Sequence, residues 1–452
     1  MRPRLSDIAA RLGHPRSLPD TPGWQARLDS REVRPGDLFV ALPGERQDGH
    51  AYVAAALAAG AAAVVAEGGR LSADLRGDAR VLAVEESASA LLELGALARD
   101  RHEGLVAAIT GSNGKTTTKD LAVQVLSTSR TTAGSRGNQN STSGAPISLL
   151  NELDGQQVYV MEAGMSQPGE IARLCAMARP THGLITNIQP AHLEGTGGLE
   201  AVAGEKGQLF RWLEAHGGTG IVNEDDPLVA RQAEILTRRS SWSLRHHRAG
   251  ALGMEAVDVD GQARHLFRLS GQELRLPVPG QAFLECAAAV CALALELGLG
   301  PEQIVSGLGG FSGATGRMSV RRGPGWTLLD DSYNANPASM KAALNTLAQT
   351  AATRRVAVLG EMKELGGESA TLHREVGCFA AGLALDLVLL VGSEDARAAL
   401  REGLREGGRG VDGEAASARG LAAAFSPRAG DAVLLKGSRL TGLEALAGEW
   451  LP

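Results

Sequence analysis

An α/β protein of three domains is expected from three observations. Short apolar runs of strand length alternate with segments of helical period along most of the 452 residues, and such alternation is typical of parallel sheets covered by helices. The alternation is interrupted near residue 240 and restarts after about residue 315. The chain is also too long for one typical domain. We expect a small N-terminal α/β domain in residues 1–84, a central parallel-sheet domain with a phosphate-binding P-loop in 85–314, and a C-terminal Rossmann-like α/β domain in 315–452.

The composition narrows the class of protein. Hydrophobic residues make up 44% of the chain and aromatic residues 3%, so the cores must consist mainly of Ala, Val and Leu. The net charge of −6 argues against a nucleic-acid partner. The N-terminal segment has no apolar signal core, and the longest apolar stretch, 53–66, is too short to span a bilayer. Four cysteines without a CxxC pair favour free thiols in a reducing compartment. We expect a cytoplasmic monomer with no membrane insertion.

The N-terminal domain begins the alternation of strands and helices. Residues 37–42 and 61–66 are predicted strands, and 51–59 is a predicted helix that ends at Gly60. Residues 87–101, rich in alanine and leucine, predict a helix that leads into the next domain.

The central domain continues with longer apolar runs that predict buried parallel strands. The predicted strands are 105–110, 158–163, 183–188 and 219–223. The predicted helices are 115–127, 168–178 with Pro168 in its first turn, and 199–215. Residues 239–279 alternate polar and apolar side chains instead, which predicts a small antiparallel excursion.

The C-terminal domain repeats the α/β alternation. The predicted strands are 326–331, 355–360, 386–391 and 431–436, and the predicted helices are 337–349, 369–382 and 440–449. The segment contains no GxGxxG motif, and the chain has no internal repeat of fixed period.

The segment LVAAITGSNGKTTTK, residues 105–119, carries the strongest chemical signal. An apolar run ends in a glycine-rich turn with Lys115 and Thr116, and a helix is expected to follow. Unpaired amides at that helix N-terminus suit a polyphosphate, Lys115 adds a positive charge, and the Thr116 hydroxyl is a ligand for Mg²⁺. The usual P-loop pattern has a glycine where this chain has Ile109, so an ordinary glycine-rich turn is the alternative.

Polar side chains stand at the ends of several predicted strands. They are Glu162, Asn187, Asp330, Asp331 and Lys436, and His192 follows shortly after one of them. Ligands of open α/β sheets bind at the carboxyl ends of the strands, so these residues together favour a binding site, although each alone could be a helix cap or a solvated loop residue. Mg²⁺ prefers oxygen ligands, which suits Glu162 better than His192. A lone lysine such as Lys206, within a predicted amphipathic helix, is usually solvated.

The motifs together resemble those of the Mur ligase family. The matching segments run nearly from end to end: DSREVRPGDLFVALPGERQDGH (29–50), ITGSNGKTTTK (109–119), GNQNSTSGAPISLL (137–150), MEAGMSQPGEI (161–171), AHLEG (191–195), LLDDSYNANPASM (328–340), VAVLGEMKELG (356–366) and LLKGSR (434–439). The first and the last three are most similar to members that add D-alanyl-D-alanine to a UDP-N-acetylmuramoyl-tripeptide.

The resemblance implies an ATP-dependent ligase of cytoplasmic peptidoglycan precursor synthesis. The N-terminal domain would bind the UDP-sugar, the central domain ATP, and the C-terminal domain would close over both and bring the dipeptide. The terminal carboxylate of the tripeptide would attack the γ-phosphate to give an acyl phosphate and ADP. The amine of D-Ala-D-Ala would then attack the activated carbonyl and release phosphate.

The resemblance also implies roles for residues around ATP. The phosphates would be held by the loop residues Gly111, Ser112, Asn113, Gly114, Lys115, Thr116 and Thr117. One Mg²⁺ would bind Thr116 and Glu162, and a second would bind His192 and a carbamylated Lys206, whose carbamate supplies oxygen ligands. Arg317 would contact the γ-phosphate. Asp331 would bind the ribose, with Tyr333 and Asn334 near the base.

Substrate residues follow from the same resemblance. Those expected to face the UDP-sugar are Ser30, Arg31, Glu45, Arg46, Asp48 and His50. Those expected to line the route to the tripeptide are Asn138, Asn140 and Thr142. Those expected to meet the dipeptide or the peptide carboxylate are Lys436, Ser438 and Arg439.

Two departures from the family pattern keep alternatives open. The usual HNxxN segment, in which an asparagine contacts adenine, is replaced by QAFLEC at residues 281–286, and an acid commonly found two residues after the carbamylated lysine is Gln208. One alternative is another Mur-type amino-acid ligase, although the DNPR or DNPA motif of the diamino-acid enzyme and the glycine-rich N-terminal fingerprint of the earlier enzymes are absent. The other is a nucleotide-binding paralogue that no longer ligates.

Overall fold

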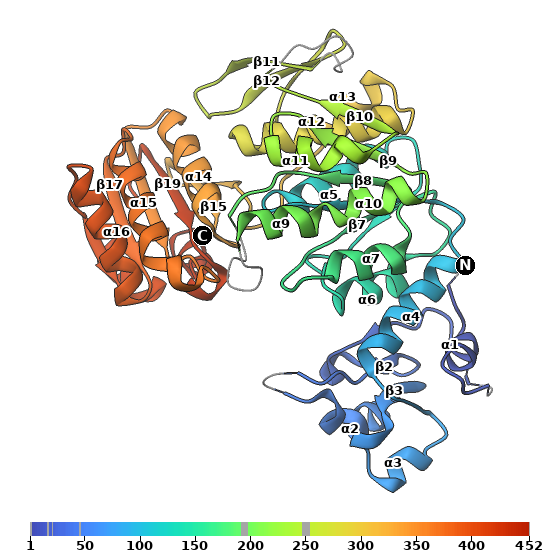
Figure 1. The fold of residues 1–452 in the computed structure, drawn as a ribbon. Coiled ribbons are helices and arrows are strands. Elements are labelled where there is room, and N and C mark those ends of the chain that lie inside the picture. The colour runs from blue at the N-terminus through green and yellow to red at the C-terminus, as the bar shows by residue number, and fades with distance from the viewer. Residues whose placement is uncertain are drawn as a thin grey trace. The chain divides into compact units, whose positions relative to one another are not determined.

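The computed structural model describes residues 2–15, 18–19, 21–44, 47–190, 198–245 and 254–451 (Figure 1). Its contacts divide the chain into two compact units. The first comprises residues 1–110, 130–183 and 211–219, and the second comprises 111–129, 184–210 and 220–452. Each unit is described by itself.

The first unit begins with a four-stranded parallel sheet in the order β1-β2-β3-β4. Its strands are β1 (Ala26–Arg27), β2 (Leu38–Val40), β3 (Ala63–Glu67) and β4 (Val81–Val84). Its helices are α1 (Leu5–Arg11), α2 (Val53–Ala58) and α3 (Ala73–Gly77), with short 3-10 turns η1 (Ser30–Glu32), η2 (Gly49–Tyr52) and η3 (Gly68–Arg70). Strand residues such as Phe39 and Val64 pack against Val53 and Leu57 of α2 in one apolar cluster. The two predicted strands and the predicted helix are confirmed.

The remainder of the first unit carries three parallel strands and their helices. The elements are α4 (Ser87–Asp100), β5 (Leu105–Thr110), β6 (Thr132–Gly134), α6 (Gly144–Glu152), β7 (Val158–Glu162), α7 (Glu170–Ala178) and the start of β8 (His182–Ile185). Strand β7 pairs in parallel with both β5 and β6. Helix α7 begins after Gly169, which has φ of +86°, so Pro168 precedes the helix and does not lie in its first turn as expected.

The second unit contains the phosphate-loop helix and the rest of the central elements. They are α5 (Lys115–Leu126), α9 (Leu199–Lys206), the start of α10 (Gln208–Ala215), β9 (Thr219–Asn223), α11 (Pro227–Gln232), η4 (Ala233–Ile235), β10 (Arg239–Trp242), α12 (Gln281–Glu296) and α13 (Pro301–Gly309). Within this unit β10 pairs with β9. The segment 199–215, predicted as a single helix, forms two, because α9 ends at Lys206 and α10 begins at Gln208, with Gly207 between them.

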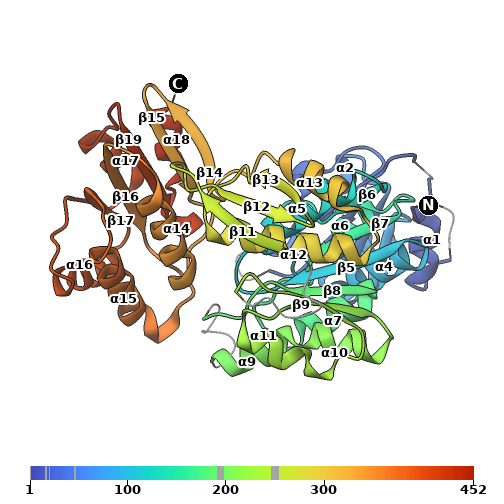
Figure 2. The same cartoon turned by 90° about the horizontal axis from the view of Figure 1, so that it is seen from above.

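The predicted antiparallel excursion is a three-stranded sheet (Figure 2). Its strands are β11 (Met254–Val259), β12 (His265–Leu269) and β13 (Gln272–Arg275), and β12 pairs antiparallel with both neighbours. The antiparallel region starts later in the sequence than the predicted residue 239, because β10 still pairs in parallel with β9.

The C-terminal part of the second unit is a six-stranded sheet in the order β14-β15-β19-β16-β17-β18. The strands are β14 (Ser319–Gly323), β15 (Trp326–Asp331), β16 (Arg354–Gly360), β17 (Leu387–Val391), β18 (Gly413–Ala415) and β19 (Asp431–Lys436). The helices are α14 (Pro337–Gln349), α15 (Ser369–Ala381), α16 (Glu394–Glu406), α17 (Ala418–Ala424) and α18 (Glu444–Trp450), with turns η5 (Gly366–Glu368) and η6 (Arg439–Thr441). Only β14 runs antiparallel to its neighbour.

Helices cover both faces of this C-terminal sheet (Figure 1). Alternate strand residues such as Leu329 and Leu359 pack against α14, α15 and α16, whereas Leu328 and Val358 pack against α17 and α18 on the opposite face. This period of two confirms the Rossmann-like architecture expected for the region.

One further expectation is met. All four cysteines are free thiols. None of the helices in the described part of the chain has both the length and the apolar composition that crossing a membrane requires.

Candidate functional site

The phosphate loop needs glycine at two positions for different reasons. Gly111 has φ of +144°, and a Cβ there would lie 1.9 Å from Thr186 Oγ1. Gly114 has φ of +81° and precedes the first residue of α5, Lys115. The amide of Thr118 donates to the Gly114 carbonyl at 2.8 Å, as in a regular helix start. The loop is thus folded so that the N-terminal amides of α5, a 12-residue helix, are presented together.

Hydrogen bonds with the segment that follows β8 hold the loop in place. Ser112 N donates to the Asn187 carbonyl at 2.9 Å, and Ser112 Oγ donates to the Gln189 carbonyl at 2.8 Å. Asn113 N donates to Asn187 Oδ1 at 2.9 Å, and Thr186 Oγ1 donates to the Asn113 carbonyl at 2.6 Å. Such a network holds the loop in one conformation before any ligand arrives.

Two lysine side chains converge on one oxygen of the loop. Lys115 Nζ donates to the Gly111 carbonyl at 2.8 Å and Lys206 Nζ donates to the same oxygen at 3.1 Å. Lys206 is only 2% exposed, so the alternative of a solvated lysine is wrong. Burial lowers the pKa of Lys206 well below its ordinary value, and the nearby charge of Lys115 lowers it further. Thr116 is buried and Thr117 half-buried in the first turn of α5.

The start of α12 replaces the expected HNxxN segment. Gln281 Nε2 donates to Glu285 Oε1 at 3.4 Å, and burial raises the pKa of Glu285. The Cys286 sulfur would lie 3.1 Å from a Cβ at Gly114. Burial raises the pKa of Cys286 to about 11, so its thiol is a packing group against the loop and not a nucleophile. A side-chain amide and a carboxyl thus lie in the turn of α12 in which the family usually carries the HNxxN segment.

The ends of β15 and β19 bring several predicted residues together. Lys436 Nζ donates to Asp331 Oδ2 at 2.8 Å and to the Asn334 carbonyl at 2.7 Å. Next to them, the Arg317 guanidinium lies 4.0 Å and the Arg439 guanidinium 5.4 Å from the centroid of the Tyr333 ring. Two cations on one ring make this cluster strongly positive.

The segment after β19 is tied to the segment after β16. Ser438 N donates to the Glu361 carbonyl at 2.9 Å, and Lys363 N donates to Ser438 Oγ at 2.9 Å. These bonds connect the motifs GEMK and KGSR, which lie far apart in the sequence, and they fix the predicted Ser438 in place.

The predicted tripeptide residues lie in the first unit beside a buried carboxylate. Asn140 Nδ2 donates to Glu162 Oε1 at 2.7 Å, and Glu162 is 1% exposed. Thr142 Oγ1 donates to Glu170 Oε1 at 3.4 Å, while Asn138 is exposed. The structure thus places two of the predicted motifs, GNQN and MEAG, against each other.

The predicted UDP-sugar residues differ in exposure. His50 is buried: its Nδ1 donates to Asp48 Oδ1 at 2.6 Å and its Nε2 accepts from Glu67 N at 3.0 Å. Hydrogen bonds to Asp48 from the His50 backbone amide and from the His50 ring lower the pKa of Asp48. Arg31 is exposed and pairs with Asp29, and Ser30 is half-buried. His50 therefore supports the turn, whereas Arg31 faces solvent. Glu45, Arg46 and His192 lie outside the described residues.

Several residues of the loop network had no local sequence signal. Thr186 and Gln189 flank the noted Asn187, and Asn336 caps α14. The one sequence signal available for this network was a polar residue directly after a buried strand. That signal identified only Asn187.

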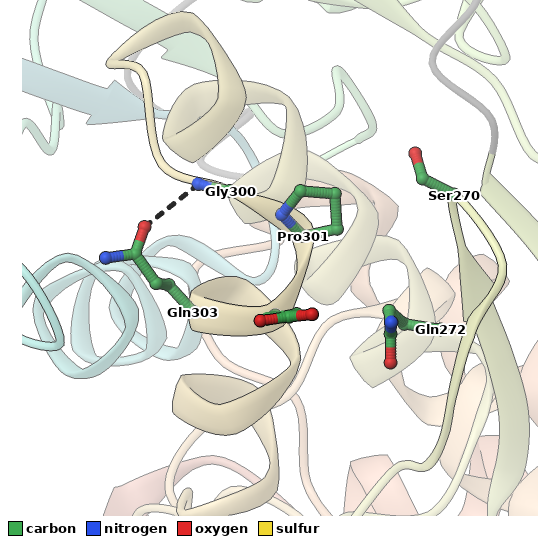
Figure 3. Close-up of a pocket in the computed structure, with 6 residues that line it drawn as sticks. Ser270, Gln272, Gly300, Pro301 and Gln303 are labelled. Carbon is green, nitrogen blue, oxygen red and sulfur yellow. Dashed lines mark hydrogen bonds between the residues drawn. The ribbon is translucent and has the colours of Figure 1, made fainter.

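An open pocket of about 300 Å³ lies at the start of α13, away from these residues (Figure 3). It is lined by Ser270, Gln272, Gly300, Pro301, Glu302 and Gln303. Gln303 Oε1 accepts from Gly300 N at 3.0 Å, which caps the helix. No predicted site residue lines this pocket.

Family models cover most of the chain. Residues 26–99 match the Mur ligase family catalytic domain, residues 109–294 the Mur ligase middle domain, and residues 316–439 the Mur ligase glutamate ligase domain. The chain belongs to the Mur ligase family. The Mur ligase fold expected from the motifs is thereby confirmed.

Similar Mur ligases agree with this assignment. A UDP-N-acetylmuramoyl-tripeptide–D-alanyl-D-alanine ligase of Escherichia coli K12 is 35% identical over 84% of this chain and 83% of its own length. The ligase of that name from Mycobacterium tuberculosis H37Rv is 36% identical over 93% of this chain and 90% of its own. Among solved structures, MurF from Acinetobacter baumannii has a TM-score of 0.83 and 31% identity over 98% of this chain and 97% of its own. MurF from Thermotoga maritima in complex with ADP has a TM-score of 0.79 and 28% identity over 95% of this chain and 97% of its own.

Proposed function

We propose that this Mur ligase joins D-alanyl-D-alanine to UDP-N-acetylmuramoyl-tripeptide at the expense of ATP, in the cytoplasmic synthesis of peptidoglycan precursors. The observation that carries the proposal is the phosphate loop held by these hydrogen bonds. It presents helix amides together with the converging side chains of Lys115 and Lys206. The similarity to ligases of that name over 93% of the chain supports the choice of substrates.

ATP binds through the loop and the cluster at the end of β15. The amides of residues 111–117 and Lys115 hold the phosphates, and Lys115 exchanges its loop carbonyls for phosphate oxygens. Asp331 binds the ribose, with Tyr333 and Asn334 near the base. Gln281 and Glu285 offer hydrogen-bonding groups in place of the family asparagine.

The oxygen-rich side chains fit magnesium, which screens the charge of the triphosphate when bound. Thr116 and the buried Glu162 would supply ligands for one ion. They belong to different units, so their pairing rests on the sequence resemblance. A carbamylated Lys206 and His192 would supply ligands for the second ion. The shared Gly111 carbonyl supports this modification, because two ammonium groups on one oxygen repel and carbon dioxide combines with an uncharged amine.

The remaining residues position the reacting groups. Arg317 holds the γ-phosphate as a tripeptide carboxylate oxygen attacks the γ-phosphorus. A new oxygen–phosphorus bond forms, and the bond from the γ-phosphorus to the β,γ-bridging oxygen breaks, so ADP leaves with that oxygen. Lys436, Ser438 and Arg439 orient the dipeptide, whose amine then attacks the acyl carbon, loses a proton and displaces phosphate. The departing phosphate keeps the former carboxylate oxygen.

The placement of the other substrates follows the sequence motifs. Ser30, Arg31, Glu45, Arg46, Asp48 and His50 serve the UDP-sugar in a domain of residues 1–84, with His50 as a support. Asn138, Asn140 and Thr142 line the tripeptide route in the domain of residues 85–314. The domain of residues 315–452 closes over the nucleotide, and the enzyme acts as a monomer.

A coupled phosphate-release assay tests the substrates. Release should require ATP, magnesium, UDP-N-acetylmuramoyl-tripeptide and D-Ala-D-Ala together. Release with a single amino acid or a diamino acid in place of the dipeptide would favour another Mur-type ligase. No release with any of these acceptors would favour a paralogue that binds nucleotide without ligation.

A further inference from the structure

Asn113 forms hydrogen bonds through both its backbone and its side chain. Its backbone is held by Thr186 and Asn187, as described above. Its Nδ2 donates to Gln189 Oε1 at 2.7 Å. The amide side chain is therefore fixed in orientation, with Oδ1 left to accept from another direction.

That acceptor is used by a residue 223 positions further along the chain. Asn336 Nδ2 donates to Asn113 Oδ1 at 2.6 Å. Both residues are half-buried, so the bond is partly shielded from competing water. It is a direct link between the phosphate loop and the start of α14.

Asn336 uses its two side-chain atoms for two different tasks. Its Oδ1 accepts from Ser339 N at 2.9 Å, which caps the 13-residue helix α14, and its backbone N donates to Ser339 Oγ at 3.0 Å. Asp, Ser and Thr cap helices about as well as Asn. Only Asn among them also carries an amide donor that can reach the loop. The choice of Asn is thus explained by the second task and not by the cap.

The segment 331–336 is anchored at both of its ends, and the link provides one of the two anchors. At one end Asp331 Oδ1 accepts from Met318 N at 3.0 Å, and Asp331 Oδ2 accepts from Lys436. At the other end Asn336 is bonded to the loop. The Tyr333 ring between them carries the guanidinium of Arg317. A displacement of Asn113 is therefore passed to groups that contact the nucleoside and the γ-phosphate.

We propose that Asn336 is a positioning residue that couples the phosphate loop to the segment 331–336. The role rests on the proposed function, because it concerns the alignment of Arg317 and Tyr333 on the nucleotide bound by the loop. Asn336 itself touches neither the substrate nor the reacting atoms.

Three variants separate the coupling from the cap. Asn336→Asp keeps a strong N-cap and replaces the donor to Asn113 with a charged acceptor, so kcat should fall about tenfold while the KM for ATP stays within twofold. Asn336→Ser should behave in the same way without adding a charge. Ser339→Ala, the matched control, removes the reciprocal capping bond and leaves the link, so it should lower the melting temperature but not kcat. Wild-type kcat in Asn336→Asp would overturn the proposal.

Hydrogen exchange provides a readout that does not depend on ligation. Binding of ADP with Mg²⁺ should slow exchange in peptides covering both 111–118 and 331–340 of the wild-type chain, but only 111–118 in Asn336→Asp. Equal slowing of 331–340 in the variant, or no slowing there in the wild type, would overturn the coupling. A wild-type chain that shows coupled exchange but releases no phosphate would instead count against the proposed reaction alone.

Discussion

The substitution Gly111→Ala tests whether the loop geometry described above is required. The added methyl group would start 1.9 Å from Thr186 Oγ1 and 3.1 Å from Thr186 N. Rotation of the Thr186 side chain removes the first clash but breaks its hydrogen bond to Asn113, whereas the second contact is with backbone and remains.

The expected cost combines two effects. Holding a non-glycine residue in a sparsely populated backbone region costs about 1–3 kcal/mol, and overpacking a tight site costs about another 1–3 kcal/mol. The sum, roughly 2–6 kcal/mol, is a large part of the 5–15 kcal/mol that typically stabilises a protein. Gly271→Ala is the matched control, since Gly271 has φ of +86° with no atom within 4 Å of an added Cβ. It should show the backbone cost alone, about 1–2 kcal/mol.

Urea unfolding monitored by circular dichroism, together with ADP titration, measures both consequences. Gly111→Ala should unfold at clearly lower urea than Gly271→Ala and should bind ADP at least tenfold more weakly, because the displaced amides no longer converge. The double variant Gly111→Ala/Thr186→Ala should recover part of the stability. Gly111→Ala that matches the wild type in both assays would refute the steric argument.

Three further outcomes are expected. In the Lys115→Ala variant, kcat should fall at least a hundredfold while the melting temperature stays unchanged. Retained activity would contradict the role of Lys115 in holding the phosphates. The Lys206→Ala variant should lose activity and regain part of it when short carboxylic acids replace the carbamate oxygens. Full activity in this variant without added acid would contradict the carbamylation of Lys206. The buried His373 accepts from Met362 N and donates to the Ser369 carbonyl, and burial lowers its pKa. The unfolded chain therefore binds a proton more readily, so stability should fall as pH drops below about 6.5, by at most about 1.4 kcal/mol per pH unit, and His373→Gln should flatten this slope.

The parts of the fold that were predictable are those with strong local patterns. Buried strands such as 105–110 and 431–436 are continuous apolar runs, and α5 follows a glycine-rich turn, so neighbouring residues alone determine them. Strand β14, with sequence SVRRG, is a largely exposed edge strand and has no apolar period to detect. At Gly207 the chain leaves regular helix for a single residue whose backbone stays near helical, so the periodic pattern runs through the break without marking it.

The candidate site was predictable only as a set of separate motifs. The lysine of a glycine-rich turn and an acid at a strand end indicate chemistry by their local pattern, so Lys115 and Asp331 were singled out by the sequence alone, whereas Lys206 was singled out only by the resemblance to the Mur ligase family. The partners that hold them come from remote positions. The link from Asn113 to Asn336 joins two residues that each looked like ordinary members of their motif. Only the folded chain brings them within hydrogen-bonding distance, at 2.6 Å.

Oxygen tracing tests the central claim, that the loop holds ATP so that its terminal phosphate passes to a peptide carboxylate. The tripeptide substrate is labelled with ¹⁸O in its terminal carboxylate and incubated with the enzyme, ATP, magnesium and D-Ala-D-Ala. Mass spectrometry of the released phosphate should show one ¹⁸O atom transferred for each doubly labelled peptide consumed. Phosphate that is released with ligation but carries no label would contradict transfer to the carboxylate.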